Sequence, residues 1–278
     1  MIDFTGKVVL VTGGGAGIGR ATAEAFGRAG ASVVVAEISE ERAKDVRSAL
    51  DGAGVQNLVS VTDVCDRAAV DALFQAVDER FGGLDVVVNN VGDFLGIIKP
   101  FEFYTDEDID QVYAVNLKSV MLVSRAAIPL LRKRGPGGSI ISVSSIEAFR
   151  GIPNTVVYSA MKHGITGFTR SLALELGPEG IRVNAIAPET TETPQVPVHA
   201  MIADEHKHHT PRWIPLGRFG TPEDMAGTAL FLASDLAGWI TGTTVNVDGG
   251  ALAAAGWYRD PKGMWTNVPV VTGNGFNF

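Results

Sequence analysis

The pattern of hydrophobic positions along the chain alternates between short apolar runs and longer amphipathic stretches. The short runs are rich in β-branched residues and lack strict apolar–polar alternation, which is typical of strands covered on both faces. This pattern predicts strands at Lys7–Thr12, Ser32–Ala36, Leu58–Val61, Leu84–Asn89, Ser139–Val143, Arg182–Ile186 and Thr244–Val247. Helical spacing predicts helices near Gly17–Ala29, Glu40–Gly52, Arg67–Phe81, Asp106–Arg134, Tyr158–Leu176 and Pro222–Ala233. The alternation favours βαβ units, and therefore a layered α/β fold on a parallel sheet.

Two regions depart from this alternation. Residues 189–217 contain four prolines and four histidines, and a long excursion of this kind predicts a lid over a site. Residues 251–278 follow the last strand and are more aromatic than a solvated tail needs. We expect this C-terminal extension to pack against another subunit, in a homotetramer.

Length and charge narrow the classes of function. The 278 residues are 46% hydrophobic, enough for one substantial core, and we expect one domain over residues 1–278. The formal net charge of -8 argues against nucleic acid and membrane surfaces as partners. A lone Cys65 and an N-terminus without a signal peptide predict a reducing, cytoplasmic location.

A glycine-rich segment follows the first predicted strand and opens the first predicted helix. It reads Gly13-Gly14-Gly15-Ala16-Gly17-Ile18-Gly19, with the spacing G-x-x-x-G-x-G. Glycines let the backbone approach a pyrophosphate at a helix N-terminus. We therefore expect Gly13, Gly15, Gly17, Ile18 and Gly19 to bind a dinucleotide.

The end of the second strand indicates which dinucleotide binds. Glu37 places a carboxylate where it can accept hydrogen bonds from a ribose diol and repel a 2′-phosphate, so NAD is favoured over NADP. No arginine or lysine is evident nearby to pair with a phosphate. After the third and fourth strands, further residues are expected along the adenine and ribose: Asp63, Val64, Asn90, Val91 and Gly92.

Tyr158 and Lys162 are four residues apart near the start of a predicted helix, so they share one face. A tyrosine is a weak base at neutral pH, but a neighbouring ammonium favours its phenolate. Tyr158 would then exchange a proton with an alcohol or ketone. Taken alone, such a spacing is far more often an ordinary half-exposed helix pair than a catalytic one.

When the Tyr158–Lys162 pair is taken together with other segments, the chain resembles the short-chain dehydrogenase/reductase family from Lys7 to Gly250. The matching segments are Thr12–Gly19, Asn89–Gly92, Asn116, Ser144-Ser145, Tyr158 with Lys162, Arg182–Asn184 and Asp248–Gly250. The resemblance implies a Rossmann-like, doubly wound, seven-stranded parallel sheet in three α/β/α layers, with a nicotinamide cofactor.

The resemblance also assigns roles to individual residues. It implies a catalytic tetrad of Asn116, Ser145, Tyr158 and Lys162, in which the spacing of thirteen residues selects Ser145 rather than Ser144. Asn116 would hold a water that links Lys162 to solvent. Cofactor contacts are implied for Tyr158, Lys162, Pro188, Thr191 and Thr193. Glu189 stands where the family usually has glycine and adds charge beside the expected nicotinamide.

The sequence indicates the substrate less clearly than the cofactor. The expected pocket walls Asp93–Leu95, Ile152-Pro153 and Trp213 favour a hydrophobic secondary alcohol or ketone, alicyclic or steroid-like. A 3-oxoacyl or 3-hydroxyacyl thioester is the alternative substrate. A nucleotide-sensing protein without chemistry is the alternative from another class, although it has no need of the tetrad. No metal is expected, because the spacing of Glu205, His206, His208 and His209 matches no simple site.

Overall fold

The main sheet has seven parallel strands in the order β3-β2-β1-β4-β5-β6-β7. A computed structural model describes residues 2–202, 210, 214–254, 258–259 and 264–266. The strands of the sheet are β1 (Val8–Thr12), β2 (Ser32–Glu37), β3 (Asn57–Val61), β4 (Val86–Asn89), β5 (Ser139–Val143), β6 (Arg182–Pro188) and β7 (Thr244–Val247).

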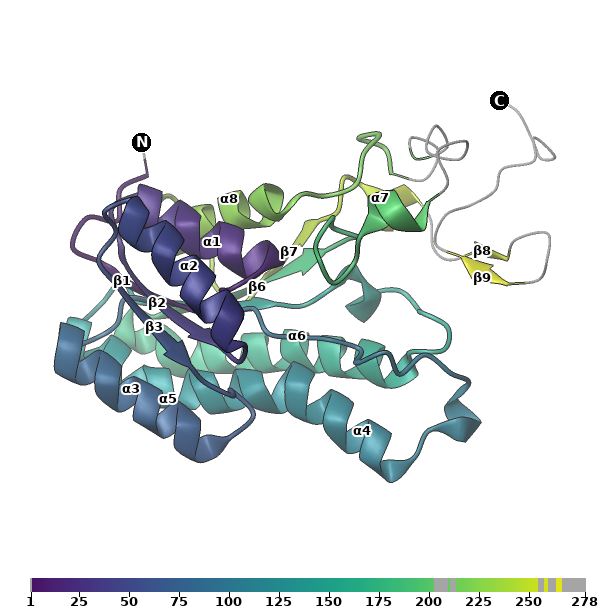
Figure 1. Cartoon of the computed structure of the whole chain (residues 1–278), viewed down its shortest axis with the longest axis horizontal. Helices are drawn as coiled ribbons and strands as arrows, with labels where there is room; N and C mark the ends of the chain where they lie inside the picture. The colour runs from purple at the N-terminus through teal and green to yellow at the C-terminus, as the bar shows by residue number, and fades with distance from the viewer. Residues whose placement is uncertain (1, 203–209, 211–213, 255–257, 260–263, 267–278) are drawn as a thin grey trace.

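Helices cover both faces of this sheet (Figure 1). On one face lie α1 (Gly17–Arg28), α2 (Glu40–Gly52) and α8 (Pro222–Ala233). On the other lie α3 (Arg67–Phe81), α4 (Asp106–Tyr113), α5 (Ser119–Arg134) and α6 (Val156–Leu176). The predicted three-layer, Rossmann-like architecture is therefore confirmed.

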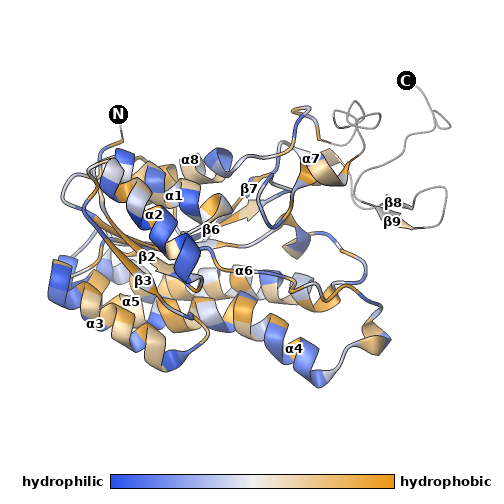
Figure 2. Ribbon diagram, in the orientation of Figure 1, coloured by the Kyte–Doolittle hydropathy of each residue, from blue (hydrophilic) through white to orange (hydrophobic). Residues whose placement is uncertain are grey.

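Two buried apolar clusters fill the space between the layers. One gathers side chains such as Val9, Val33 and Phe26 beneath α1, α2 and α8. The other gathers Leu10, Val34 and Leu131 beneath α3, α5 and α6. Since neighbouring strand residues point to opposite faces, both faces of each strand need apolar side chains. Orange is accordingly prominent on β2 and β6 between the helix layers in Figure 2.

The strand order reverses direction between β1 and β4, because β2 and β3 continue to one side and β5 to the other. In an open parallel sheet, such a reversal leaves a crevice outside the carboxyl ends of the strands. The loops after β1, β4, β5 and β6 all open into this crevice. The fold thus determines where the site lies.

The predicted helix over Asp106–Arg134 is interrupted. A π-helical turn at Ala114–Lys118 separates α4 from α5, and it contains Asn116. By length and composition alone, this stretch could cross a membrane. Of the 18-residue segment that meets this criterion, 50% is buried inside the protein. A core helix passes the same test, and α5 packs its apolar face into the second cluster.

The two unusual regions are described in part. Within residues 189–217, Val198–Met201 form α7, and Thr191 makes an isolated bridge with Gly220. After β7, Ala251–Ala254 form α9, and a short antiparallel pair joins β8 (Tyr258–Arg259) to β9 (Trp265–Thr266). The predictions for Trp213, Glu205, His206, His208 and His209 lie outside the described residues, as do residues 255–257, 260–263 and 267–278 of the C-terminal extension.

Candidate active site

A cavity of about 1280 Å³ occupies the crevice at the carboxyl ends of the strands. It gathers almost all the residues singled out from the sequence. Those in its wall are Gly13, Gly17, Ile18, Glu37, Asp63, Val64, Asn90, Val91, Gly92, Ser145, Tyr158, Lys162, Pro188, Thr191 and Thr193. The predicted residues Gly15, Gly19 and Asn116 do not line the cavity, but each lies against a residue of its wall.

The glycine segment has the shape of a cradle. Gly13 and Gly17 adopt left-handed backbone angles, with φ of 62° and 52°. A Cβ on Gly19 would collide with the carbonyl oxygen of Gly13, so only glycine lets the strand turn this tightly into α1. The backbone therefore approaches the cavity closely at the N-terminus of α1, as a dinucleotide pyrophosphate requires.

Glu37 is buried at the end of β2, with 3% of its surface exposed. Its Oε2 accepts a hydrogen bond from the Gly15 amide at 3.0 Å, which ties the carboxylate to the glycine segment. The interpretation that no basic residue lies nearby is wrong. Arg42 donates from Nη2 and Nε to Oε1 of Glu37, at 2.7 and 3.0 Å. The first turn of α2 brings Arg42 back over the end of β2. The spacing of five residues between Glu37 and Arg42 did not indicate this contact in the sequence.

The segment after β4 is divided between the interior and the cavity. Asn89 is buried and donates to Ser124 and Ser142, whereas Asn90 lines the cavity and donates to the Thr12 carbonyl at 3.0 Å. A Cβ on Gly92 would lie 2.5 Å from Nζ of Lys162. Glycine at this position therefore leaves room for the lysine to pass beneath the loop.

Ser144 and Ser145 follow β5 and have different partners. The Ser144 hydroxyl donates to the Lys162 carbonyl at 2.9 Å, which fastens α6 to the strand end. The Ser145 hydroxyl oxygen accepts from the Glu147 amide at 3.1 Å, and its hydrogen bond to Tyr158 lowers the pKa of that phenol. Of the two serines, Ser145 therefore stands beside Tyr158.

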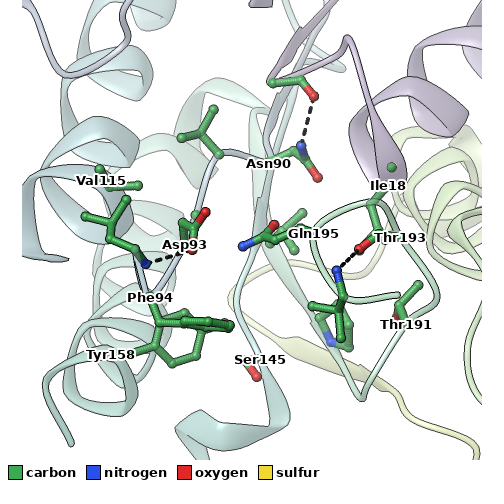
Figure 3. A pocket seen from close by; sticks show the side chains of 18 of the residues that line it. Ile18, Asn90, Asp93, Phe94, Val115, Ser145, Tyr158, Thr191, Thr193 and Gln195 are labelled. Atoms are coloured by element: carbon green, nitrogen blue, oxygen red, sulfur yellow. Dashed lines mark hydrogen bonds between the residues drawn. The ribbon is translucent and has the colours of Figure 1, made fainter. Parts of the chain in front are cut away.

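Tyr158 and Lys162 lie on the same face of α6, as their spacing predicts. The Lys162 ammonium lies 5.5 Å from the centre of the Tyr158 ring, and its Nζ donates to the Val143 carbonyl at 3.0 Å. Burial lowers the pKa of Lys162 to about 8. In Figure 3, Tyr158 lies on the same side of the cavity as Ser145 and Phe94.

The expected lowering of the Tyr158 pKa does not occur in this structure. Enclosure of the phenol in the protein raises its pKa above the ordinary value, and the charges of Glu147 and Asp93 raise it further. Desolvation disfavours the phenolate more strongly than the Ser145 hydrogen bond favours it. Tyr158 is therefore in its protonated, acid form at neutral pH.

Asn116 is fully buried in the π-helical turn and faces the loop after β4. Its Nδ2 donates to the carbonyls of Asp93 and Val112, and its Oδ1 accepts from the Asp93 amide at 3.1 Å. The extra residue in this turn allows a side-chain amide to replace regular helical bonding. Asn116 thereby fixes Asp93 in the cavity wall.

An apolar wall closes the cavity beyond Tyr158. The ring of Phe94 meets the Tyr158 ring edge-on with centroids 6.1 Å apart, and Leu95, Ile152 and Pro153 continue the wall as expected. Leu95 and Asn154 both have positive φ, at 55° and 66°. These are costly conformations outside glycine, and they cluster at this end of the cavity.

Several cavity residues carried no sequence signal that singled them out. They are Arg42, Glu147, Thr155 and Gln195, and Figure 3 shows Gln195 between Asp93 and Thr193. His163, next to Lys162, bonds the Ala148 carbonyl through Nδ1 at 2.8 Å. Within the part of the chain that the structure describes, no group of His, Cys, Asp and Glu side chains has the arrangement of a metal site.

Known proteins share both the sequence and this fold. A family model described as enoyl-(acyl carrier protein) reductase matches residues 13–251. The 3β-hydroxysteroid dehydrogenase 1 of Eggerthella lenta is 41% identical, with 89% of this chain and 94% of that protein covered. The 3-oxoacyl-[acyl-carrier-protein] reductase of Thermotoga maritima is 37% identical, with coverages of 88% and 97%.

Solved structures agree with the sequence comparison. A 7α-hydroxysteroid dehydrogenase complexed with NADH and 7-oxo glycochenodeoxycholic acid superposes with a TM-score of 0.83 at 32% identity, covering 90% of this chain and 95% of that one. A short-chain dehydrogenase from Burkholderia cenocepacia in complex with NADP gives a TM-score of 0.81 at 36% identity, covering 89% and 98%. The chain therefore belongs to the short-chain dehydrogenase/reductase family, oxidoreductases that interconvert hydroxyl and keto groups.

Proposed function

We propose that the protein is an NAD-dependent oxidoreductase acting on a hydrophobic secondary alcohol or its ketone. One observation carries the proposal: Ser145, Tyr158 and Lys162 line the same cavity as the glycine cradle of α1. Proton-transfer groups and a dinucleotide site are thus within one continuous space. A nucleotide sensor would need the cradle but not the tyrosine in the cavity wall and the buried lysine.

The residues of the cradle fit a nicotinamide dinucleotide. Positive φ at Gly13 and Gly17, and the absence of room for a Cβ at Gly19, favour a pyrophosphate at the N-terminus of α1. Gly15, Ile18, Asp63, Val64, Asn90, Val91, Gly92, Pro188, Thr191 and Thr193 would complete its contacts. When bound, the nicotinamide would supply or accept the hydride.

We assign NAD rather than NADP on the strength of Glu37. Its buried carboxylate would accept bonds from a ribose diol and repel a 2′-phosphate. Arg42 works against this preference, because a guanidinium suits a phosphate. In the structure Arg42 is already engaged by Glu37, so the carboxylate reduces the attraction that this guanidinium offers.

The remaining steps belong to the chain itself. For a ketone, Tyr158 donates its phenolic proton to the substrate oxygen while Ser145 donates a hydrogen bond to the same atom. Lys162 then stabilises the phenolate by its charge. In the opposite direction Tyr158 removes the alcohol proton. Asn116 positions Asp93 and holds the water expected to link Lys162 to solvent.

The apolar wall supports an alicyclic or steroid-like substrate. Phe94, Leu95, Ile152 and Pro153 would cover its carbon skeleton, and the hydroxysteroid dehydrogenases among the relatives support the same class. The similarity to a 3-oxoacyl reductase supports the alternative, a 3-oxoacyl or 3-hydroxyacyl thioester. We further propose one domain over residues 1–278, with 189–217 as its lid, in a cytoplasmic homotetramer.

Nicotinamide absorbance over a substrate panel tests this function. We expect turnover of alicyclic alcohols and hydroxysteroids with NAD, or of the matching ketones with NADH. Higher kcat/KM for 3-oxoacyl thioesters than for every cyclic ketone would favour the alternative. NADH binding without turnover of any hydroxyl or keto compound would favour a sensor.

A further inference from the structure

Three charged side chains that follow β5 and β6 form a buried cluster, and two of them, Glu147 and Glu189, line the cavity. Nη2 of Arg150 donates to Oε1 of Glu147 and to Oε2 of Glu189, at 2.8 Å each. Nε of Arg150 also donates to Oε2 of Glu147, at 3.3 Å. The side chains of Arg150, Glu147 and Glu189 are 7%, 9% and 4% exposed. Their charge-assisted bonds are therefore largely shielded from water.

The Glu147 end of the cluster belongs to the turn that carries Ser145. The Glu147 amide donates to the Ser145 hydroxyl oxygen at 3.1 Å. The hydroxyl of Ser159, the residue after Tyr158, donates to the Glu147 carbonyl at 2.6 Å. Any shift of Glu147 would consequently move the Ser145 hydroxyl relative to the Tyr158 phenol.

The Glu189 end belongs to the segment that covers the glycine cradle. Oε1 of Glu189 accepts bonds from the amide and hydroxyl of Thr190, at 2.6 and 2.7 Å, and its carbonyl accepts from the Thr191 hydroxyl at 2.9 Å. A few residues on, Cγ2 of Thr193 would lie 3.2 Å from a Cβ on Gly17. Glu189 therefore anchors the start of a segment that reaches across to α1.

We propose that Arg150 is a positioning residue that couples the Ser145 turn to this covering segment through Glu147 and Glu189. The coupling rests on the proposed function, since it joins the group that would bind the substrate oxygen to the segment that would close on the dinucleotide. The ion pair with Arg150 also gives Glu189 a structural role, at a position where the family usually has glycine. Small displacements of a positioned group lower turnover strongly, so loss of the guanidinium should be visible in kcat.

A double-mutant cycle separates positioning from general destabilisation. We expect Arg150→Met to lower kcat about tenfold or more in the wild-type protein, but less than about twofold when Ser145 is already alanine. Residual activity in the Ser145→Ala background is measured at high enzyme concentration. Arg132→Met is the matched control, because Arg132 pairs with Glu179 at 2.6 Å on the surface. Equal losses in both backgrounds, or no loss in the wild type, would overturn the proposal.

A measurement of NADH binding tests the Glu189 end of the cluster without a turnover assay. NADH fluorescence should give a dissociation constant about fivefold or more higher for Glu189→Gly, whereas Glu189→Gln, which keeps one of the two acceptor oxygens, should raise it by a smaller factor. Circular dichroism confirms folding of each variant. Normal NADH binding by wild type with no change in Glu189→Gly overturns the coupling alone. A wild-type protein that fails to bind NADH overturns the proposed function and the coupling with it.

Discussion

The guanidinium of Arg42 holds the carboxylate of Glu37 with two donors, at 2.7 and 3.0 Å, in the wall of the proposed dinucleotide site. A group that repels a 2′-phosphate is thus bonded to one that would attract it. The balance between NAD and NADP therefore depends on a pair, and not on the acid alone.

Removing the acid from this pair should shift the cofactor preference. We expect wild-type kcat/KM to favour NADH over NADPH by about 100-fold or more, and Glu37→Ala to raise kcat/KM for NADPH about tenfold. Glu37→Ala/Arg42→Ala is the control, because the gain should vanish when the freed guanidinium is also removed. Equal wild-type kcat/KM values for NADH and NADPH would contradict the carboxylate argument.

Tyr158→Phe should bind NADH within about twofold of wild type and lose turnover by about 1,000-fold or more, since proton transfer is removed and the ring is retained. Absorbance assays and NADH fluorescence measure the two quantities. Tyr104→Phe is a suitable control, because Tyr104 bonds the Ile97 and Asn154 carbonyls outside the proton-transfer path. Near-normal turnover of Tyr158→Phe would reject the assigned acid.

The direction of the reaction should respond to pH through Tyr158. Because enclosure in the protein raises the pKa of its phenol, the acid form needed for ketone reduction persists through neutral pH. We expect the reduction kcat to be flat between about pH 6 and 8, and the oxidation kcat to rise across this range as phenolate forms. Stopped-flow traces in both directions provide the profiles. A reduction rate that falls tenfold from pH 6 to 8 would show that the tyrosine pKa is lowered to roughly 7 and not raised.

We expect Lys162 to lower the free energy of unfolding near neutral pH. Its pKa is lowered to about 8 in the folded chain against 10.5 for an ordinary lysine, so the buried ammonium destabilises the fold below about pH 8. Stability should then rise as pH increases from about 8 to 10.5, because the unfolded chain binds more protons there.

Lys162→Met removes this titration. We expect the variant to exceed wild type in free energy of unfolding by on the order of 2 kcal/mol at pH 7, with the difference shrinking toward pH 10. Urea unfolding at the two pH values checks both statements. Lys133→Met, which removes an exposed partner of Asp78, should show no comparable pH dependence. A variant less stable than wild type at pH 7 would be inconsistent with a costly ammonium.

The C-terminal extension provides a test of assembly. A chain ending at Gly250 should lose the homotetramer proposed here, with a lower mass by light scattering and reduced turnover per active site. A full-length protein that is monomeric, or a truncated one with unchanged mass and turnover, would refute the assignment. Melting temperatures of both chains distinguish lost assembly from lost folding.

Elements with strong periodicity were predictable because local patterns determine them. The apolar runs at β1 and β5 and the glycines before α1 carry their own geometry, and the structure agrees with each to within a residue or two. The same holds for the Tyr158–Lys162 face, which follows from helical spacing. The predicted site residues converge because the parallel strands end at one edge.

What was missed depends on contacts that form only when helices and strands pack together. Arg42 meets Glu37 because α2 turns back over β2, and Arg150 meets Glu189 because β5 and β6 are neighbours in the sheet. The raised pKa of Tyr158 reflects how much protein surrounds the ring, which a neighbouring lysine in the sequence does not reveal. Charge pairing and desolvation are tertiary properties, so residue spacing alone was insufficient.

The π-helical turn at Ala114–Lys118 determines how far α5 is rotated about the helix axis relative to α4. Each added residue rotates an α-helix by about 100°, so this turn lets Asn116 aim at the loop after β4 while Val123 and Ala127 of α5 still face the sheet. Deleting any one residue here would restore a regular helix and put one of these two alignments out of step. The number of residues between Asp106 and Arg134 is therefore constrained, and not only the identity of Asn116.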